Sequence, residues 1–179
     1  MTATTTTPPD LDLVRSFVNT IDYEDGSDQL GSAAALHRWM VDQQRASATS
    51  RATNADLDLA LRLREALRAE LSAHHDGPAD HDTSPELDAV FRELPLRVVG
   101  SGDGLAPCGT GIQGGLAQIV AAVATARIRG TWPRLKICPA EDCRWAFYDT
   151  SRNHSRRWCS MESCGNRNKV RAFRDRTRG

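Results

Sequence analysis

Four of the five cysteines lie near the C-terminus in a pattern that suits metal binding. They form two equally spaced pairs, Cys138-x4-Cys143 and Cys159-x4-Cys164, separated by fifteen residues. Zinc favours four thiolate ligands in a tetrahedron, and a short interval within each pair lets one turn present two sulfurs. Because all four positions are cysteine, no coordination site is left for water. The sequence therefore predicts one structural Zn2+.

Two disulfides or four free thiols are the alternative interpretations of these cysteines. The chain begins MTATTTTPPD, which has neither the basic residue nor the apolar run of a signal peptide. We therefore expect a cytoplasmic protein, in which disulfides are disfavoured. His154 lies between the pairs, but four cysteines already saturate a zinc ion, so we expect it to be solvated or to contact phosphate. Cys108 stands apart and is expected to be an ordinary thiol.

Basic residues are concentrated in the same segment. Residues 134–179 hold 12 Lys/Arg and 5 Asp/Glu, a net charge of +7, whereas residues 1–133 hold 11 and 18, a net charge of −7. A concentrated basic tract is typical of modules that bind polyanions, and an acidic segment repels phosphates. Arginine outnumbers lysine by 21 to 2, and its planar fork suits phosphate and guanine. We therefore expect DNA as the partner of the C-terminal segment.

The segment after Cys159 has helical spacing, with four arginines on one face at i, i+4, i+7 and i+11. We expect Val170 and Phe173 beside this stripe to hold the helix to the metal knuckle. The predicted nucleic-acid-binding residues come from this helix and from the loop between the cysteine pairs: Arg152, Arg156, Arg157, Arg167, Lys169, Arg171, Arg174 and Arg178.

Three other interpretations of the basic helix stay open. The helix could dock on the acidic part of the same chain, because the two charges are equal and opposite. It could belong to a zinc-stabilised module that binds an acidic protein without touching DNA. It could also bind RNA, because Trp158 and the neighbouring arginines combine stacking with positive charge.

The upstream residues, which must position this module, have mainly helical patterning. Apolar spacing predicts helices over residues 11–22, 32–46, 54–74, 85–93 and 115–129, with Asp28 or Ser32 as the N-cap of the second and Asn54 of the third. Two extended runs around a glycine-rich turn at residues 96–105 predict one β-hairpin. We expect a mainly α chain: a disordered leader at 1–10, a helical domain at 11–133, and a four-cysteine zinc-finger module at 134–179 that ends in a basic helix.

Several polar residues of the helical domain are candidate ligand contacts. Asn19 and Thr20 fall within the first apolar helix, and with Trp39 and Arg64 they mark a candidate pocket for a small-molecule effector. The alternative is that they are buried groups whose hydrogen bonds are satisfied within the fold. The same domain is a candidate homodimer interface.

Three other patterns carry weaker signals. Residues 109–115 (GTGIQGG) precede a helix but lack the Lys-Ser/Thr of a phosphate-binding loop, which favours turn and cap chemistry. A loop with three histidines and three aspartates is a candidate metal site but is better explained as solvated: His74, His75, His81, Asp76, Asp80 and Asp82. We find no Ser-His-Asp or Cys-His signature and no acid/base pair, so we expect no enzyme. No run approaches the roughly 20 apolar residues of a membrane helix, so we expect no membrane partner.

The tetrapeptide Cys164–Arg167 (CGNR), with SRRWCSM at 155–161 and KVR at 169–171, resembles the CGNR zinc finger, a family named for this motif. Residues 17–20 (FVNT), the pair Leu36 and Trp39, and residues 63–68 (LREALR) are similar to the ABATE domain that precedes such fingers. The resemblance covers nearly the whole chain. It implies a stress-induced transcriptional regulator, although DNA binding in the family is inferred from the same basic residues.

Overall fold

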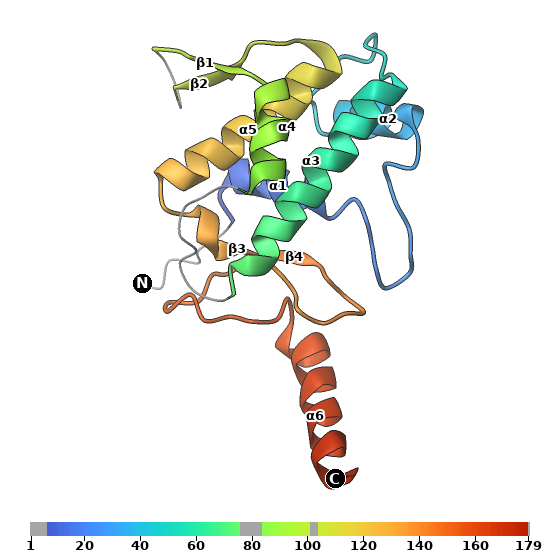
Figure 1. Cartoon of the computed structure of the whole chain (residues 1–179), viewed down its shortest axis with the longest axis vertical. Helices are drawn as coiled ribbons and strands as arrows, with labels where there is room; N and C mark the ends of the chain where they lie inside the picture. Colours follow the sequence, from blue (N-terminus) through green and yellow to red (C-terminus); the bar gives the residue numbers. More distant parts are fainter. Residues whose placement is uncertain (1–6, 76–83, 101–103, 179) are drawn as a thin grey trace.

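The computed structural model describes residues 7–75, 84–100 and 104–178, and it is mainly helical, as predicted (Figure 1). The helices are α1 (Pro9–Val18), α2 (Ala33–Asp42), α3 (Asn54–Ala73), α4 (Pro85–Glu93), α5 (Gly111–Ile128) and α6 (Asn166–Arg178), with short turns η1 (Trp132–Arg134) and η2 (Met161–Gly165). The strands form two antiparallel hairpins, β1 (Leu96–Val98) with β2 (Leu105–Pro107), and β3 (Leu135–Ile137) with β4 (Ala146–Tyr148). None of the described helices is long and apolar enough to cross a bilayer.

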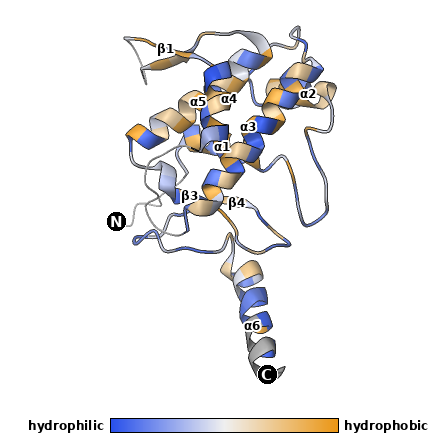
Figure 2. Cartoon of the chain, in the orientation of Figure 1, coloured by the Kyte–Doolittle hydropathy of each residue, from blue (hydrophilic) through white to orange (hydrophobic). Residues whose placement is uncertain are grey.

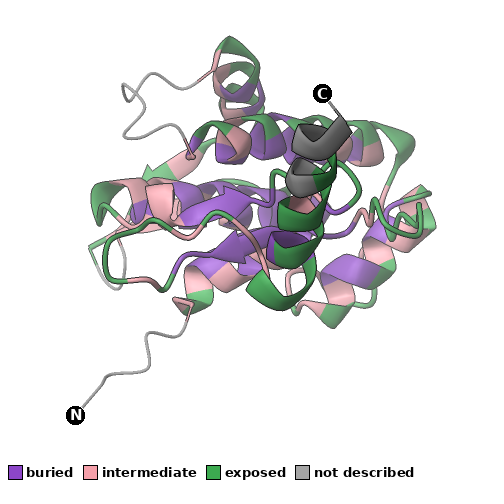
Figure 3. Ribbon diagram, turned by 90° about the horizontal axis from the view of Figure 1, so that it is seen from below, coloured by how far each residue is buried: buried purple, intermediate pink, exposed green. Residues whose placement is uncertain are grey.

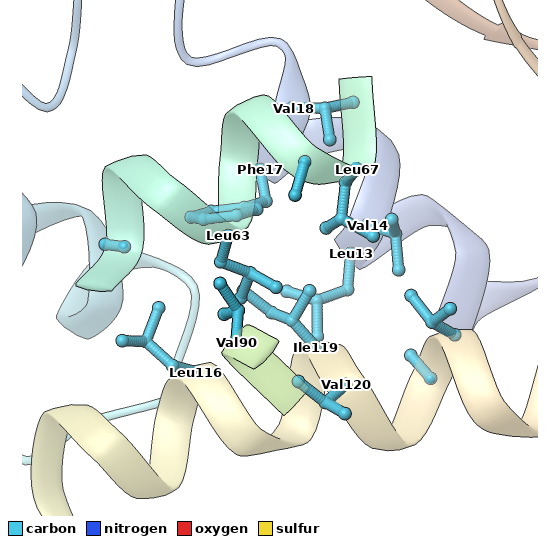
Figure 4. Close-up of a cluster of buried hydrophobic side chains, with 14 of the residues drawn as sticks. Leu13, Val14, Phe17, Val18, Leu63, Leu67, Val90, Leu116, Ile119 and Val120 are labelled. Carbon is cyan, nitrogen blue, oxygen red and sulfur yellow. The ribbon is translucent and has the colours of Figure 1, made fainter. Parts of the chain in front are cut away.

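The core is built around α5, which is apolar on all sides and packs against α1, α2 and α3. Figure 4 shows Leu116 and Ile119 of α5 facing Phe17 of α1 and Leu63 of α3. These four side chains are fully buried. Burying a side chain of this kind contributes about 1.5–3 kcal/mol, so the core holds the helices in fixed positions.

At three helix ends, side-chain hydrogen bonds explain where the helix begins or ends. The first helix ends at Val18, so Asn19 is its C-cap and not an interior residue as predicted, because the Asn19 side chain pairs with β4. The N-cap of α3 is Thr53, not Asn54, because the Thr53 hydroxyl and the Asp56 carboxylate bond each other's backbone N–H in a capping box. The prediction of Ser32 as one of two candidate caps for α2 is confirmed, since its hydroxyl accepts from the Ala35 N–H at 3.1 Å.

The glycine-rich segment forms the first turn of α5, which starts at Gly111 and not near residue 115 as predicted. A Cβ on Gly115 would lie 2.8 Å from the Arg45 carbonyl oxygen and 3.0 Å from Met40 Sδ. Only a glycine therefore lets α5 approach the end of α2 this closely. The glycine-rich segment therefore has a structural role, in agreement with the interpretation favoured over phosphate binding.

The second hairpin was not predicted, because strands of three residues are too short to show an alternating pattern. Its two faces serve different parts of the molecule. One face packs into the main core through Leu135, Ile137, Ala146 and Tyr148, and the opposite face places Phe147 in a separate cluster with the cysteines. The hairpin is therefore a wall shared by the helical core and the cysteine cluster.

Side chains from the helical domain bond both outer edges of this hairpin. The Asn19 amide donates to the Ala146 carbonyl at 2.9 Å and accepts from its N–H at 2.7 Å, as a neighbouring strand would. On the other edge, His74 Nδ1 and His75 Nε2 contact the carbonyls of Leu135 and Ile137 at 2.6 and 2.5 Å. The interpretation of both histidines as part of a solvated loop was therefore wrong. The remaining members of that predicted cluster, His81, Asp76, Asp80 and Asp82, lie outside the described residues.

Burial lowers the pKa of His74 below its usual value of 6.5. The unfolded chain therefore takes up a proton at a higher pH than the folded chain does. The neutral His74 side chain therefore makes its full contribution to the free energy of unfolding above about pH 6.5. This contribution is lost as the pH falls through the lower folded-state pKa. We expect urea midpoints measured between about pH 8 and pH 5 to fall on the acid side. The fall should be shallower in His74→Asn, whose amide replaces the Nδ1 donor. His37→Asn, which changes a half-buried histidine of α2, is the control, and equal slopes in all three proteins would refute this role.

Candidate metal centre

The four predicted ligand cysteines come together beneath the β3–β4 hairpin, with all four Sγ atoms within 4.8 Å of one another. Cys159 Sγ lies 3.5 Å from that of Cys143 and 3.6 Å from that of Cys164. A tetrahedral ion with Zn–S bonds of about 2.3 Å separates its sulfurs by about 3.8 Å, whereas a disulfide bond is about 2.05 Å long. All four are free thiols. The donors and their spacing fit one four-coordinate ion, consistent with zinc.

Each cysteine pair is presented by a different local structure. Cys138 follows β3 and Cys143 precedes β4, and the Cys138 N–H donates to the Trp145 carbonyl at 2.9 Å. Cys159 precedes the η2 turn and Cys164 lies within it, and the Ser160 hydroxyl accepts from the Ser163 N–H at 3.3 Å. One hairpin knuckle and one helical turn therefore face each other across the cluster.

The tetrapeptide Cys164–Arg167 has local hydrogen bonds that close the second knuckle. The Gly165 N–H donates to the Ser160 carbonyl at 3.0 Å. The Asn166 amide donates to the Glu162 carbonyl at 3.2 Å, which links the first residue of α6 to η2. The helix therefore begins directly at the metal site.

Arg167 lies against the metal centre. Its Nη2 donates to Cys164 Sγ at 3.3 Å, and its Nη1 lies 3.3 Å from Glu24 and 3.4 Å from Asp142. Burial pushes the pKa of Cys164 upward, but the hydrogen bonds from Arg167 and the neighbouring thiols outweigh it and lower that pKa. Arg167 therefore favours the thiolate form of a ligand and ties it to an acidic loop of the helical domain. Its predicted contact with nucleic acid stays a prediction.

The pKa values of Cys143 and Cys159 are shifted in the opposite direction. Burial raises the pKa of Cys143 to about 11 and also raises the pKa of Cys159 above its usual range. Both are therefore protonated at neutral pH without a metal, so binding of a divalent ion must release their protons.

A buried ion pair beside the β3–β4 hairpin fixes the shape of the loop between the cysteine pairs. Lys136 Nζ lies 2.9 Å from Asp149 Oδ2, and the side chains are 6% and 0% exposed. The Asp149 carboxylate also accepts from the backbone N–H groups of Ser151 and Arg156, each at 2.9 Å. Lys136 Nζ donates to the His154 carbonyl at 2.6 Å. Sequence reasoning did not single out this pair, because neither residue belongs to a recognisable motif.

Two further side chains of this loop have internal contacts. Arg156 Nε donates to the Trp158 carbonyl at 2.9 Å, Nη2 donates to the Cys159 carbonyl, and the guanidinium lies 5.1 Å from the centre of the Phe147 ring. His154 Nε2 accepts from Arg134 Nε at 2.8 Å. Arg156 therefore fixes the backbone at Cys159, and the His154 ring contacts Arg134.

A buried arginine joins the helical domain to the first knuckle. Arg68 is 3% exposed and donates to the carbonyls of Val18 at 2.6 Å and of Arg144 at 2.9 Å. Its guanidinium also lies 4.8 Å from the centre of the Tyr23 ring, which Arg144 approaches at 5.7 Å. The sequence analysis placed Arg68 in the 63–68 stretch but predicted none of these contacts, because the partners are distant in the chain.

The remaining predicted basic contacts with described side chains are exposed: Arg152, Arg157, Lys169, Arg171 and Arg174. Figure 1 shows α6 extending away from the helical body, and Figure 3 shows its described turns exposed. Figure 2 shows hydrophilic residues along its middle. Arg167, Arg171 and Arg174 line one groove of about 640 Å³ along this helix, together with Val170.

Val170 does not anchor α6 as predicted, because it is 49% exposed. Polar contacts hold the first turn instead: the Asn168 amide donates to the Cys164 carbonyl at 2.9 Å, beside the contacts of Arg167. The side chains of Phe173 and Arg178 lie outside the described residues.

The candidate effector residues have structural contacts. Trp39 packs against Phe17 with ring centres 5.5 Å apart, and the buried Arg64 guanidinium bonds Asp28 at 2.7 and 2.8 Å and the Thr20 hydroxyl at 3.1 Å. Asn19 pairs with β4, as described above. The effector pocket at Asn19, Trp39 and Arg64 stays a prediction.

A four-cysteine knuckle that leads into a helix, mounted on a helical domain, is the architecture of a zinc-finger protein. Residues 134–177 match the model of the CGNR zinc finger, and residues 11–136 match the ABATE model, described as "putative stress-induced transcription regulator". Because the second match spans more than half of the chain, this chain belongs to the ABATE family and carries a CGNR zinc finger. The predicted resemblance is confirmed. No curated protein matches the chain.

Proposed function

We propose that this chain is a DNA-binding transcriptional regulator. In this proposal, one Zn2+ held by the four clustered cysteines fixes the direction of α6, whose basic side chains contact DNA. The helical domain senses an effector or pairs with a second copy. The observation that carries the proposal is the joint between the metal centre and α6, because the helix starts two residues after Cys164 and extends away from the body (Figure 1).

The helix needs such a joint for physical reasons. It has 13 residues, and isolated helices shorter than about 12–15 residues are marginal in water. When bound, the ion would cross-link the two knuckles and supply folding energy that this small segment cannot gain from its own core. Arg167 and Asn168 then hold the first turn to Cys164.

The exposed position of α6 beyond its first turn supports DNA over docking on the same chain (Figure 1). The Arg167–Glu24 contact, at 3.3 Å, joins the base of α6 to the acidic domain. The exposed arginines Arg171 and Arg174 lie farther along the helix. RNA binding through Trp158 has less support. This ring is partly buried against the cysteine cluster and lies close to Gly165, so less of its face is open for a base to stack on.

The test is salt-dependent binding of the full chain to mixed-sequence duplex DNA. Exchanging Arg171 and Arg174 for glutamate should weaken binding by at least about tenfold and reduce the salt slope by about two, since each phosphate contact contributes about one. The charge-matched control exchanges Arg51 and Arg97, two exposed arginines of the helical domain, for glutamate. This variant should bind DNA with nearly the affinity and salt slope of the wild type.

Three outcomes would contradict this function. The first is binding of the wild type to duplex DNA without any dependence on salt. The second is equal weakening of binding in both double variants. The third is stronger competition by single-stranded RNA of the same length than by the duplex, which would support the RNA-binding alternative instead.

A further inference from the structure

A second pocket lies in the helical domain, between the start of α1, β2 and the middle of α5, and contains no residue of the cysteine-bearing segment. Its volume is about 320 Å³, within the range of small-ligand sites. Six of the ten described lining residues are apolar, among them Leu13, Leu105 and Ala121, and Arg45 and Gln118 contribute polar groups. This composition is typical of a site for a small organic molecule.

Arg45 is the unusual member of this lining. Its Nη1 donates to Gln118 Oε1 at 2.8 Å, while its Nε is buried and has no hydrogen-bond partner among the described residues. The two most buried arginines are better satisfied, since Arg64 pairs with Asp28 and Arg68 donates to two backbone carbonyls. Arg45 as a whole is half-buried, but a buried donor such as its Nε normally has an acceptor. Arg45 therefore retains hydrogen-bonding capacity beside a cavity.

The backbone holds Arg45 firmly in this position. Gln44 adopts the left-handed conformation with φ 58°, which is uncommon for a residue other than glycine. This conformation ends α2, and the Arg45 N–H then donates to the Met40 carbonyl at 2.7 Å. The Arg45 carbonyl packs so closely on Gly115 of α5 that a Cβ there would lie 2.8 Å away. The backbone of Arg45 is thus fixed, and the bond to Gln118 holds its guanidinium, so less order has to be gained when a ligand binds.

The charges around the pocket favour a singly charged anion. Asp10 lines the same pocket, but its carboxylate lies 3.6 Å from Arg129 Nη1. Among the described lining residues, Arg45 is the one cation and Asp10 the one anion, and Asp10 already has Arg129 beside it. A phosphate dianion would bring a second negative charge near Asp10, whereas a carboxylate matches one planar guanidinium. The apolar walls would contact a hydrocarbon body.

We propose that this pocket binds a small carboxylate with an apolar body. The guanidinium of Arg45 receives the carboxylate, and the hydrocarbon part packs against Leu105 and Ala121. The site differs from the predicted effector residues Asn19, Trp39 and Arg64, and binding there does not depend on whether the finger binds DNA.

The test is calorimetric titration of the full chain with benzoate and hexanoate, and with the neutral analogues benzyl alcohol and 1-hexanol. Both carboxylates should bind more tightly than the alcohols. Exchanging Arg45 for glutamine should weaken carboxylate binding by about tenfold or more, since a hydrogen bond to a charged group is lost, and should leave the alcohols unchanged. Arg38→Gln changes an exposed arginine of α2 outside this lining and should have no effect.

A second variant keeps the proposal testable if Arg45→Gln does not fold. Ala121→Phe places a ring in the cavity while Arg45 is retained, and it should abolish carboxylate binding. Circular dichroism and melting would check both variants. The proposal is overturned if neither carboxylate binds the wild type at millimolar concentration, if the alcohols bind equally well, or if binding survives in either folded variant.

Discussion

Exchanging Asp149 for alanine should reduce the free energy of unfolding by about 3–5 kcal/mol, because it leaves the ammonium group of Lys136 buried without a counter-ion. The two side chains are 0% and 6% exposed, and their charged atoms lie 2.9 Å apart. The same carboxylate accepts the N–H groups of Ser151 and Arg156, so the loop between the cysteine pairs should also lose its shape. Urea unfolding followed by circular dichroism measures the loss.

Two controls separate this effect from a general loss of charge. Asp58→Ala removes an exposed ion pair with Arg62 and should cost less than about 1 kcal/mol. A double variant, Lys136→Met with Asp149→Leu, should recover most of the lost stability, because replacing both members of a buried pair by apolar residues is often near neutral. A loss below about 1 kcal/mol in Asp149→Ala, or no recovery in the double variant, would refute the role of the pair.

The effect of Asp149 should also be constant across neutral pH. Burial pushes its pKa upward, but hydrogen bonds from Ser151 and Lys136 outweigh it and hold the pKa below its usual value. A lowered carboxyl pKa gives stability that is complete above about pH 3.9 and is lost as the pH falls through the folded-state pKa. The difference between wild type and Asp149→Ala should therefore not change between about pH 8 and pH 5, unlike the effect of His74.

Removal of the metal should unfold only part of the C-terminal segment. The sequence alone predicts that all of residues 134–179 depend on zinc. In the structure, Leu135 and Tyr148 pack in the main core, and Asn19 and His74 bond the edges of the hairpin. These contacts do not pass through the metal. We therefore expect the two knuckles and α6 to lose order, while β3, β4 and the helical domain remain folded.

Hydrogen exchange before and after chelation measures this division. Amide protection should fall by at least about a hundredfold from residue 159 through α6, because an isolated short helix is marginal in water. Protection in α5 and β4 should stay within about threefold of its starting value. Loss of protection throughout β4 and α5 would show that the finger and the helical domain unfold together. Full retention in α6 would show that the metal does not support the helix.

The parts of the molecule that depend on local pattern could be predicted from the sequence. The spacing of the four cysteines placed them in one cluster, and the sulfurs lie within 4.8 Å of one another. Apolar spacing located the helices, and α4 agrees with its predicted bounds of 85–93. Both signals repeat over a few residues, so they are visible without knowledge of the fold.

The parts that depend on distant contacts could not be predicted. Asn19 pairs with a residue 127 positions away, and Arg68 with one 76 positions away, so no local pattern shows their partners. Lys136 and Asp149 depend on a hairpin whose strands are too short to recognise. Arg167 fits the predicted arginine stripe, but spacing alone does not show that its guanidinium contacts Cys164.

These contacts place the metal centre within the fold of the helical domain. The β3–β4 hairpin presents one face to each core, and Arg68 bonds the carbonyl of Arg144 in the first knuckle. The family matches overlap at residues 134–136, which include the start of the shared strand. The helical core and the first cysteine knuckle therefore share one packed hairpin.

The most direct test is to measure zinc and reactive thiols together on reduced, freshly purified full-length protein. Elemental analysis should find one zinc per chain. Of the five cysteines, only Cys108, which is exposed, should react rapidly with a thiol reagent, and all five should react after chelation. A chain that contains no stoichiometric metal and has five reactive thiols before chelation would contradict the account.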